Sequence, residues 1–455
     1  MKSTGETPIP NEPPKPEAPA PAGSPARDAS AAMPDLARWI RPGDVVVCGQ
    51  AAAEPLGLTQ ALTAQRHRFP GARVFLGAMF SRSFAPAHAD ALEFTGYGAM
   101  GRAAALFDAD GGTIVPIHYR ELEAAFASGR LHADVVLMQL PDGGDGAPAD
   151  NLGLANDYVA QAALRARAVI AEVNPDVPWT FGARPPEGLR IDHVVAATTG
   201  LIEQPILPPT EIEQRIAAHI AAIVPDRATI QTGIGRLPDT VLSALAGHRG
   251  LGLHSGLLSD GAIALIEAGA ATNEHKGIDT GLSITNILGG SRRTHRHFDR
   301  NRACRLRPAA YTHSIAVHAR LNSLHAINSV IEVDLAGQAN SEFDAGRWRG
   351  GIGGLADFVR GARLSPGGRS ILMLASTTPD GTRSRIVPTL AGARATIPAS
   401  DADWVVTEWG AAELRDCEAR ERARRLIAIA HPDHRESLIK MVKMGSDTIN
   451  CVNRV

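Results

Sequence analysis

The sequence of 455 residues has few cysteines, few aromatic residues and almost no net charge. With 46 basic and 48 acidic side chains, the formal net charge is -2. We therefore expect no nucleic-acid partner held by phosphate contacts, and no polybasic membrane-surface protein. No apolar run approaches the roughly 18 residues of a membrane helix, so no membrane span is expected either. Aromatic residues make up 4%, which gives no sign of an aromatic cage for a bulky ligand.

The cysteines are too scattered to form a framework. Their spacing contains no CxxC pair, which argues against a structural zinc site and against a disulfide-stapled fold. Reduced thiols, and with them a cytoplasmic location, are the expectation. The four positions are Cys48, Cys304, Cys417 and Cys451.

The first 32 residues are rich in proline and alanine. They contain too little apolar surface to offset the entropy of ordering, so we expect a disordered tail over residues 1–32. The basic and apolar blocks of a secretion signal are absent from this stretch. Residues 441–455 are expected to form a second, C-terminal tail.

Between the tails, short apolar runs alternate with amphipathic segments. The runs are rich in β-branched or apolar residues and are bounded by glycine, proline or charge, as buried strands are. Residues 151–167, between two of these runs, have helical spacing. This alternation predicts an α/β domain with a largely parallel sheet. The runs lie at residues 45–49, 73–80, 134–140 and 168–173.

Prolines near residues 204–212 interrupt the pattern and indicate a domain boundary. Thr210 and Glu213 then form a capping-box pair that starts a helix, with Ile212, Ile216, Ile220 and Ile223 on one face. A second α/β pattern follows, which predicts two domains, residues 33–205 and 206–440. Its expected strands are 228–235, 329–335, 370–376 and 404–409, and its expected helices run from Pro238 to 246 and over 418–430.

A glycine turn in TIQTGIGRLPDTV (229–241) is the first candidate site. Gly233 and Gly235 lie between a predicted strand and a predicted helix, so backbone N–H groups converge near the positive helix end. A phosphate or a developing oxyanion would be stabilised there. The same turn is also compatible with glycine serving only a positive φ. Pro238 excludes a dinucleotide fingerprint, which needs a glycine at that position.

A second glycine cluster, RGGIGGLADF (349–358), has four glycines in five positions. Such a segment either lets the backbone approach a ligand closely or is simply a flexible loop. Segment 325–342 interleaves Asn328 and five other polar residues with apolar positions. These polar side chains either face a site or satisfy loop backbone.

Three further features are open to two interpretations each. His254 is either a site residue or an ordinary core histidine, and Glu408 is either a site carboxylate or a solvated strand end. Asp260 is explained by capping of a short helix that ends at Gly269. The arginine-rich segment 292–307 is a solvated surface or a patch for an anionic ligand such as a nucleotide phosphate.

Taken together, these segments resemble the acetyl-CoA hydrolase/transferase family, of the 4-hydroxybutyrate CoA-transferase type. The resemblance covers about residues 33–440 and implies two CoA-transferase-type open α/β domains with the site between them, often in a homodimer or larger oligomer. It implies coenzyme A as acyl carrier, an acyl-CoA and a small carboxylate acid as partners, and no metal or redox cofactor. The most specific matches are QTGIGRLPDTVL, LGLHSGLLSDG, AINSVIEVDLAGQANSE, GGIGGLADFVRGARLSPGGRSI and VVTEWGAAELR.

The family's chemistry, as the resemblance implies it, uses a glutamate that forms an acyl-glutamyl anhydride and then an enzyme–CoA thioester. That glutamate belongs to a segment like LGIHTEM. Here the segment is LGLHSGL, and Gly256 occupies the glutamate's position. The positions carried over as CoA-binding are Gly233, Ile234, Gly235, Arg236, Leu237, Asn328, Gly351 and Gly354.

Without the glutamate, several hypotheses remain. In one, water is activated by His254 or Glu408 and hydrolyses the thioester, or a substrate supplies the missing carboxylate in a ternary complex. In another, Glu408 itself takes over as nucleophile. The alternative from a different class is a catalytically reduced CoA-binding homologue that acts as a sensor or partner subunit. The undisturbed CoA loop favours an enzyme.

Overall fold

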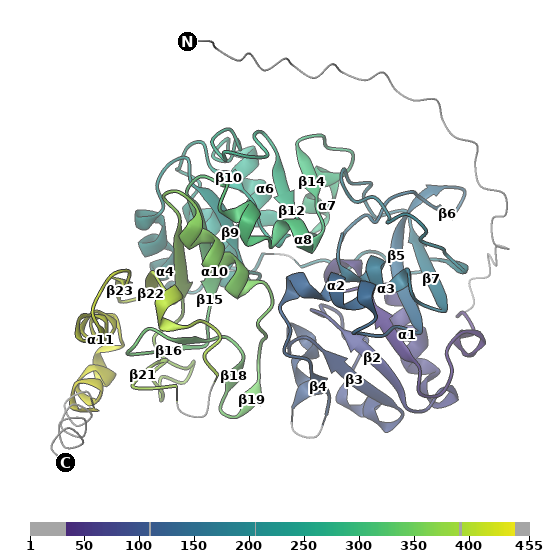
Figure 1. Cartoon of the computed structure of the whole chain (residues 1–455), viewed down its shortest axis with the longest axis horizontal. Helices are drawn as coiled ribbons and strands as arrows, with labels where there is room; N and C mark the ends of the chain where they lie inside the picture. Colours follow the sequence, from purple (N-terminus) through teal and green to yellow (C-terminus); the bar gives the residue numbers. More distant parts are fainter. Residues whose placement is uncertain (1–32, 109–110, 205, 391–393, 442–455) are drawn as a thin grey trace, which may run out of the picture.

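The structure is a computed structural model that describes residues 33–108, 111–204, 206–390 and 394–441. The predicted N-terminal tail lies outside these residues, and so does all of the predicted C-terminal tail except residue 441. Figure 1 shows two α/β halves side by side, one coloured purple to teal and the other green to yellow. Across the described ranges, no helix is long and apolar enough to cross a bilayer.

The first half is built on an eight-stranded sheet with the order β4-β3-β2-β1-β5-β7-β8, and β6 pairs with β5. All neighbours along this path run parallel. Four of the strands form at the predicted apolar runs, because each run is buried on both faces of the sheet. The strands are β1 (Val45–Cys48), β2 (Ala72–Leu76), β3 (Leu92–Gly96), β4 (Thr113–Ile114), β5 (Val135–Gly144), β6 (Ala147–Pro148), β7 (Ala168–Asn174) and β8 (His193–Ala196).

The helices of this half are α1 (Leu56–Ala64), α2 (Tyr119–Ser128) and α3 (Tyr158–Ala163). The helix predicted over 151–167 is therefore wrong in length. The Asn151 side chain accepts from the Gly153 and Thr180 N–H groups and holds the first part of this segment in turns. Asp157 then caps α3 by accepting from the Val159 N–H. Local side-chain bonds of this kind compete with the helix.

The second half contains a six-stranded sheet with the order β10-β9-β15-β20-β22-β23. The first five strands are parallel, and β23 pairs antiparallel with β22. The carboxyl ends of the parallel strands thus share one edge, where open α/β sheets bind ligands. The strands are β9 (Thr229–Thr232), β10 (Gly252–Leu253), β15 (Leu324–Ser329), β20 (Arg369–Met373), β22 (Trp404–Thr407) and β23 (Gly410–Glu413).

The single strand predicted over 329–335 is wrong. The chain leaves the main sheet at Ser329, and β16 (Glu332–Asp334) belongs to a separate three-stranded sheet. Its partners there are β17 (Ala339–Asn340) and β21 (Ile386–Val387). The remaining short strands are β11 (Leu257–Leu258), β12 (Ser283–Thr285), β13 (Ile287–Leu288), β14 (Cys304–Leu306), β18 (Phe343–Asp344) and β19 (Arg347–Trp348).

Helix α4 (Glu211–Ile223) starts with the predicted capping box, in which Glu213 accepts from the Thr210 N–H at 2.7 Å. Of the predicted apolar face, Ile216 and Ile220 are buried but Ile212 is 41% exposed. Helix α5 (Arg236–Ala244) starts two residues before Pro238, which is tolerated in a first turn because its missing N–H has no helical partner. The other helices are α6 (Asp260–Glu267), α7 (Arg292–Phe298), α8 (Ala309–Thr312), α9 (Ile315–His318), α10 (Leu355–Leu364) and α11 (Ala419–Ala428).

The two halves meet through glycine backbone. A Cβ on Gly351 would lie 2.8 Å from the Gly98 Cα, so neither position has room for a side chain. The close approach lets the Ala99 N–H donate to the Gly350 carbonyl at 2.8 Å and the Tyr119 N–H donate to the Gly353 carbonyl at 3.0 Å. The second glycine cluster is therefore a fixed contact between the halves.

Candidate functional site

A cavity of about 340 Å³ lies between the two halves, at the edge where β9 and β15 end. Both glycine clusters contribute to its wall, together with side chains from the first half. Several residues that are far apart in the sequence meet here because parallel strands present their carboxyl ends at one edge. The lining includes Gly233, Ile234, Gly256, Asn328, Gly351 and Gly354 of the residues predicted from sequence.

Asn328 is fixed in this wall by a neighbouring amide. Its Nδ2 donates to Gln231 Oε1 at 2.8 Å, and Gln231 Nε2 donates back to Asn328 Oδ1 at 3.1 Å. Other polar residues of segment 325–342 satisfy local groups instead. Asp334 accepts from Gln338 Nε2 and from loop N–H groups, and Asn340 donates to Glu332. Asn328 is thus the member of this set that sequence reasoning placed correctly at the cavity wall.

The first glycine turn links this cavity to an adjoining one, also about 340 Å³, lined by Ile234, Gly235 and Arg236. Ile234 lines both cavities. Gly235 has a φ of +116° and precedes α5, whose first N–H groups have no helical acceptor. The positive end of α5 therefore faces the route between the cavities. Leu237 instead packs against the hydrophobic core.

The first half supplies an amide and two tyrosines to the cavity wall. Tyr97 donates to Gln50 Oε1 at 2.7 Å, and Gln50 Nε2 donates to Asp157 at 2.7 Å. Tyr119 donates to Asn286 at 2.7 Å. Burial raises the pKa of both tyrosines, so they stay neutral. Sequence analysis missed these side chains, since a lone glutamine or tyrosine carries no motif.

Gly256 lies beside a histidine that the sequence did not single out. A Cβ on Gly256 would lie 2.8 Å from His313 Nε2, and a Cβ on Gly354 would lie 2.6 Å from the same atom. His313 is only 3% exposed. The edge of its imidazole therefore fills the space that the two glycines leave under the cavity.

Burial lowers the pKa of His313 to about 3, with a further contribution from the charge of His318. The ring is thus neutral at ordinary pH. Its Nδ1 is 2.8 Å from the Thr312 hydroxyl. His313 itself is not among the residues that line the cavity and lies behind Gly256 and Gly354.

Known proteins are similar to this one over most of its chain. A family model, the acetyl-CoA hydrolase/transferase C-terminal domain, matches residues 290–442. The 4-hydroxybutyrate coenzyme A transferase of Clostridium kluyveri is 38% identical over 331 residues, which cover 72% of this chain and 76% of that protein. The chain belongs to the acetyl-CoA hydrolase/transferase family.

Other similar proteins extend this match. The solved structure of RipA from Yersinia pestis has a TM-score of 0.83 and 30% identity, and the match covers 90% of this chain and 96% of that one. A 4-hydroxybutyrate CoA-transferase from Porphyromonas gingivalis has a TM-score of 0.74 and 30% identity, over 90% of this chain and 95% of that one. An acetyl-CoA hydrolase of Eremothecium gossypii is 31% identical over 56% of this chain and 50% of that protein. The fold prediction of two CoA-transferase-type halves is confirmed.

The two side chains predicted to activate water in this family member do not line the cavity. His254 is fully buried, and its Nε2–H donates to the Thr312 carbonyl at 3.1 Å. Glu408 follows β22, which β20 separates from β15. Its carboxylate accepts from the Ser376 N–H at 2.9 Å and from the Ser376 hydroxyl at 2.5 Å. His254 holds the chain beside His313, and Glu408 holds a neighbouring strand end, so neither is placed to activate water.

The carboxylates that follow Gly256 in the sequence also point away. Asp260 accepts from the Ser291 and Thr294 N–H groups and thus caps α7, not its own helix as predicted. Glu267 pairs with Arg293. Neither residue belongs to the cavity lining.

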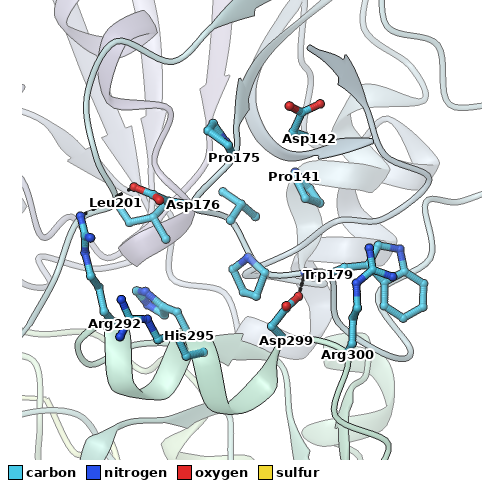
Figure 2. A pocket seen from close by; sticks show the side chains of 13 residues that line it. Pro141, Asp142, Pro175, Asp176, Trp179, Leu201, Arg292, His295, Asp299 and Arg300 are labelled. Carbon is cyan, nitrogen blue, oxygen red and sulfur yellow. Dashed lines mark hydrogen bonds and ion pairs between the residues drawn. The ribbon is translucent and has the colours of Figure 1, made fainter. Parts of the chain in front are cut away.

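The arginine-rich segment forms a different pocket of about 330 Å³, shown in Figure 2. Arg292 binds Glu203 at 3.0 Å and lies 3.7 Å from Asp176. The Arg300 guanidinium lies over the Trp179 ring. Acidic residues thus lie beside the arginines of this pocket, and a patch for an anionic ligand over 292–307 stays a prediction.

Proposed function

We propose that this chain is an acyl-CoA-processing enzyme that acts on a short-chain acyl-CoA, with water or a small carboxylate acid as the acceptor. The observation that carries the proposal is the single cavity that collects the first glycine turn, Asn328, the second glycine cluster and Gly256. The adjoining cavity along Ile234 to Arg236 offers about 340 Å³ more next to the first, and we place the pantetheine arm of the substrate there.

Polar groups in the cavity wall support attack on the thioester as the reaction step. Attack on a thioester places negative charge on its carbonyl oxygen, and N–H groups at the start of α5 are suited to stabilise that charge. The amide pair Gln231–Asn328 offers a further donor near the same strand ends.

We also propose that the enzyme forms no thioester with coenzyme A. Gly256 stands where the resemblance places the family's glutamate, and glycine has no carboxylate to form an anhydride. We expect coenzyme A to bind in calorimetric titration. We also expect no reduced glutamyl adduct when the protein is incubated with acyl-CoA, treated with borohydride and weighed intact by mass spectrometry. An adduct on this chain contradicts the assignment of Gly256, and the absence of any affinity for coenzyme A or its esters contradicts the function.

An assay with and without an added carboxylate acceptor distinguishes hydrolysis from CoA transfer. Release of free acid from acyl-CoA without an added carboxylate indicates hydrolysis, whereas CoA transfer that requires the carboxylate indicates a ternary complex. Binding without either reaction is the result expected of a CoA-binding homologue with reduced catalysis. This second function is supported by His313, which occupies the space where a side chain at position 256 would lie.

A further inference from the structure

Arg349 is the charged side chain of the cavity between the two halves. Of the described residues that line this cavity, it alone is ionised at neutral pH, because the two tyrosines stay neutral and the other polar members are amides and hydroxyls. Its side chain is 35% exposed and is therefore not sealed behind other residues. A cation that has no acidic neighbour in the same wall favours a negatively charged ligand.

One nitrogen of the Arg349 guanidinium is engaged within the protein, and two are not. Nη1 donates to Asp108 Oδ1 at 2.8 Å and to the Trp348 carbonyl at 3.3 Å. Nε and Nη2 donate to no group among the described residues. These two nitrogens form one edge of the guanidinium, whose parallel N–H bonds match the two oxygens of a carboxylate. The bonds of Nη1 thus anchor the group and leave a carboxylate-binding edge unused.

The acidic partner of Arg349 does not neutralise this part of the molecule. Asp108 belongs to the first half and does not line the cavity. It lies 2.8 Å from Arg349 Nη1 and 4.0 Å from Arg347 Nη1, so two arginines of the second half share one carboxylate. These three side chains together keep one excess positive charge. Of the two arginines, Arg349 is the one that lines the cavity.

The position of Arg349 assigns the anion to the acyl side of the substrate. Arg349 lines the first cavity but not the adjoining one, where we place the pantetheine arm. Gly256, at the position of the family's glutamate, lines the first cavity as well. An anion bound at Arg349 therefore belongs to the acyl chain that shares this cavity with the thioester.

We infer that Arg349 determines the substrate class: the cavity takes a short acyl group that carries a second, free carboxylate, as the monothioester of a dicarboxylic acid does. This inference rests on the proposed function. The edge formed by Nε and Nη2 binds the free carboxylate, and the thioester lies at the other end of the acyl chain. A chain that ends in a methyl group leaves this edge without its anion, and the cavity wall offers no acidic group in its place. Arg349 is thus a specificity-determining residue that takes no part in bond making.

Two thioethers of coenzyme A test the inference without any reaction. S-(3-carboxypropyl)-CoA carries the carboxylate, and S-butyl-CoA has the same number of chain carbons but ends in a methyl group. We expect the wild type to bind the first about 10- to 100-fold more tightly in calorimetric titration, as a charge-assisted bond does.

Two arginine variants then assign this preference to a residue. Arg349→Gln should bind the two thioethers equally, with its affinity for S-butyl-CoA and for free coenzyme A close to that of the wild type. Arg347→Gln is the matched control, because Arg347 is 62% exposed, shares Asp108 and does not line the cavity. This variant should keep the preference for the carboxylate.

The other outcomes separate the inference from the proposed function. Equal affinities of the wild type for the two thioethers overturn the inference, and this comparison does not depend on the folding of a variant. A folded Arg349→Gln that keeps the preference overturns it too. Equal weakening of both thioethers and of free coenzyme A by Arg349→Gln means that Arg349 holds a phosphate of coenzyme A, which also overturns the inference. In these cases coenzyme A still binds and the proposed function stands, whereas a wild type without affinity for any of the three ligands contradicts that function itself.

Discussion

At the scale of single residues, the space beside Gly256 is already taken. His313 Nε2 lies 2.8 Å from the place of a Cβ, and Gly354, Tyr119 and Phe358 leave the ring little room to move. Restoring a glutamate at position 256 is therefore a problem of packing as well as of chemistry. A new side chain needs the imidazole to give way.

We predict that Gly256→Glu alone destabilises the protein by about 1–3 kcal/mol, the usual cost of overpacking. It should gain little transferase activity. The double variant Gly256→Glu/His313→Ala removes the ring and should yield both CoA transfer and a glutamyl adduct that borohydride traps. Thermal unfolding and intact mass measure the two effects. His313→Ala alone is the control, and an unchanged melting temperature together with a trapped adduct in Gly256→Glu would show that the ring is not an obstacle.

A second residue-scale prediction concerns Glu408. Its carboxylate accepts two bonds from Ser376. In Glu408→Gln the amide oxygen can keep only one of these bonds, the Ser376 hydroxyl has to rotate and accept from the new NH2 group, and both bonds lose their charged acceptor. We expect a loss of about 1–3 kcal/mol in the free energy of unfolding in urea, with kcat/KM of the folded fraction retained. Glu121→Gln, at a half-exposed carboxylate near Arg120, should be close to neutral. A loss of kcat/KM without a loss of stability in Glu408→Gln would restore Glu408 as a site residue.

The sequence identified the site residues that belong to motifs and missed those that do not. The glycine turn, Asn328 and Gly256 could be predicted because each belongs to a long segment that resembles the family, and these segments follow one another in the family's order. All three contribute to the cavity lining. Gln50 and Tyr119 line the cavity and His313 lies behind Gly256 and Gly354, all through tertiary packing from other elements that nothing in their neighbouring residues indicates. His254 and Glu408 were plausible by residue type, but their orientation depends on bonds to Thr312 and Ser376 that sequence spacing does not encode.

At the scale of elements, strand positions followed from apolar runs, and strand ends did not. The run at 329–335 alternates apolar residues with Glu332 and Asp334, as a single strand would, so the exit from the main sheet at Ser329 leaves no mark in composition. The helix at 151–167 was shortened by side-chain bonds of Asn151 and Asp157 that compete with helical ones. The sequence allowed two interpretations of the second glycine cluster, a flexible loop or a segment whose backbone packs closely against another group. The contact between Gly351 and Gly98 supports the second.

That contact predicts a strict requirement for glycine at Gly351. Gly351→Ala would put its Cβ 2.8 Å from the backbone of Gly98 and 3.1 Å from the Tyr97 carbonyl, where no flexible side chain can yield. We expect a lower melting temperature and weaker binding of coenzyme A, because the cavity wall and the contact between halves move together. Gly247→Ala is the matched control, since nothing lies within 4 Å of its Cβ and its φ is not positive. Equal melting temperatures for the two variants would mean that the halves do not depend on this approach.

At the scale of the whole molecule, buried ionisable groups of both kinds set the response to acid. Burial lowers the pKa of His318 to about 4, and it lowers the pKa of His313 to about 3. It raises the pKa of Glu123 and of Glu172 to about 7. A buried neutral histidine costs stability as pH falls below the unfolded pKa of about 6.5, because only the unfolded chain takes up the proton. A carboxyl with a raised pKa acts in the opposite sense between about pH 4.5 and 7.

Because the two sets oppose each other in the wild type, the histidine contribution is best measured as a difference. We predict that the stability deficit of His318→Asn relative to wild type shrinks by about 2 kcal/mol between pH 7.5 and pH 5, since the variant no longer carries a group with a folded pKa of about 4 against an unfolded pKa of about 6.5. Urea unfolding at several pH values measures this difference, and His67→Asn, at an exposed histidine, is the control. A deficit for His318→Asn that stays constant across this range would mean that His318 has the same pKa in the folded protein as in the unfolded chain. The conclusion that the buried histidines near Gly256 are neutral would then be wrong.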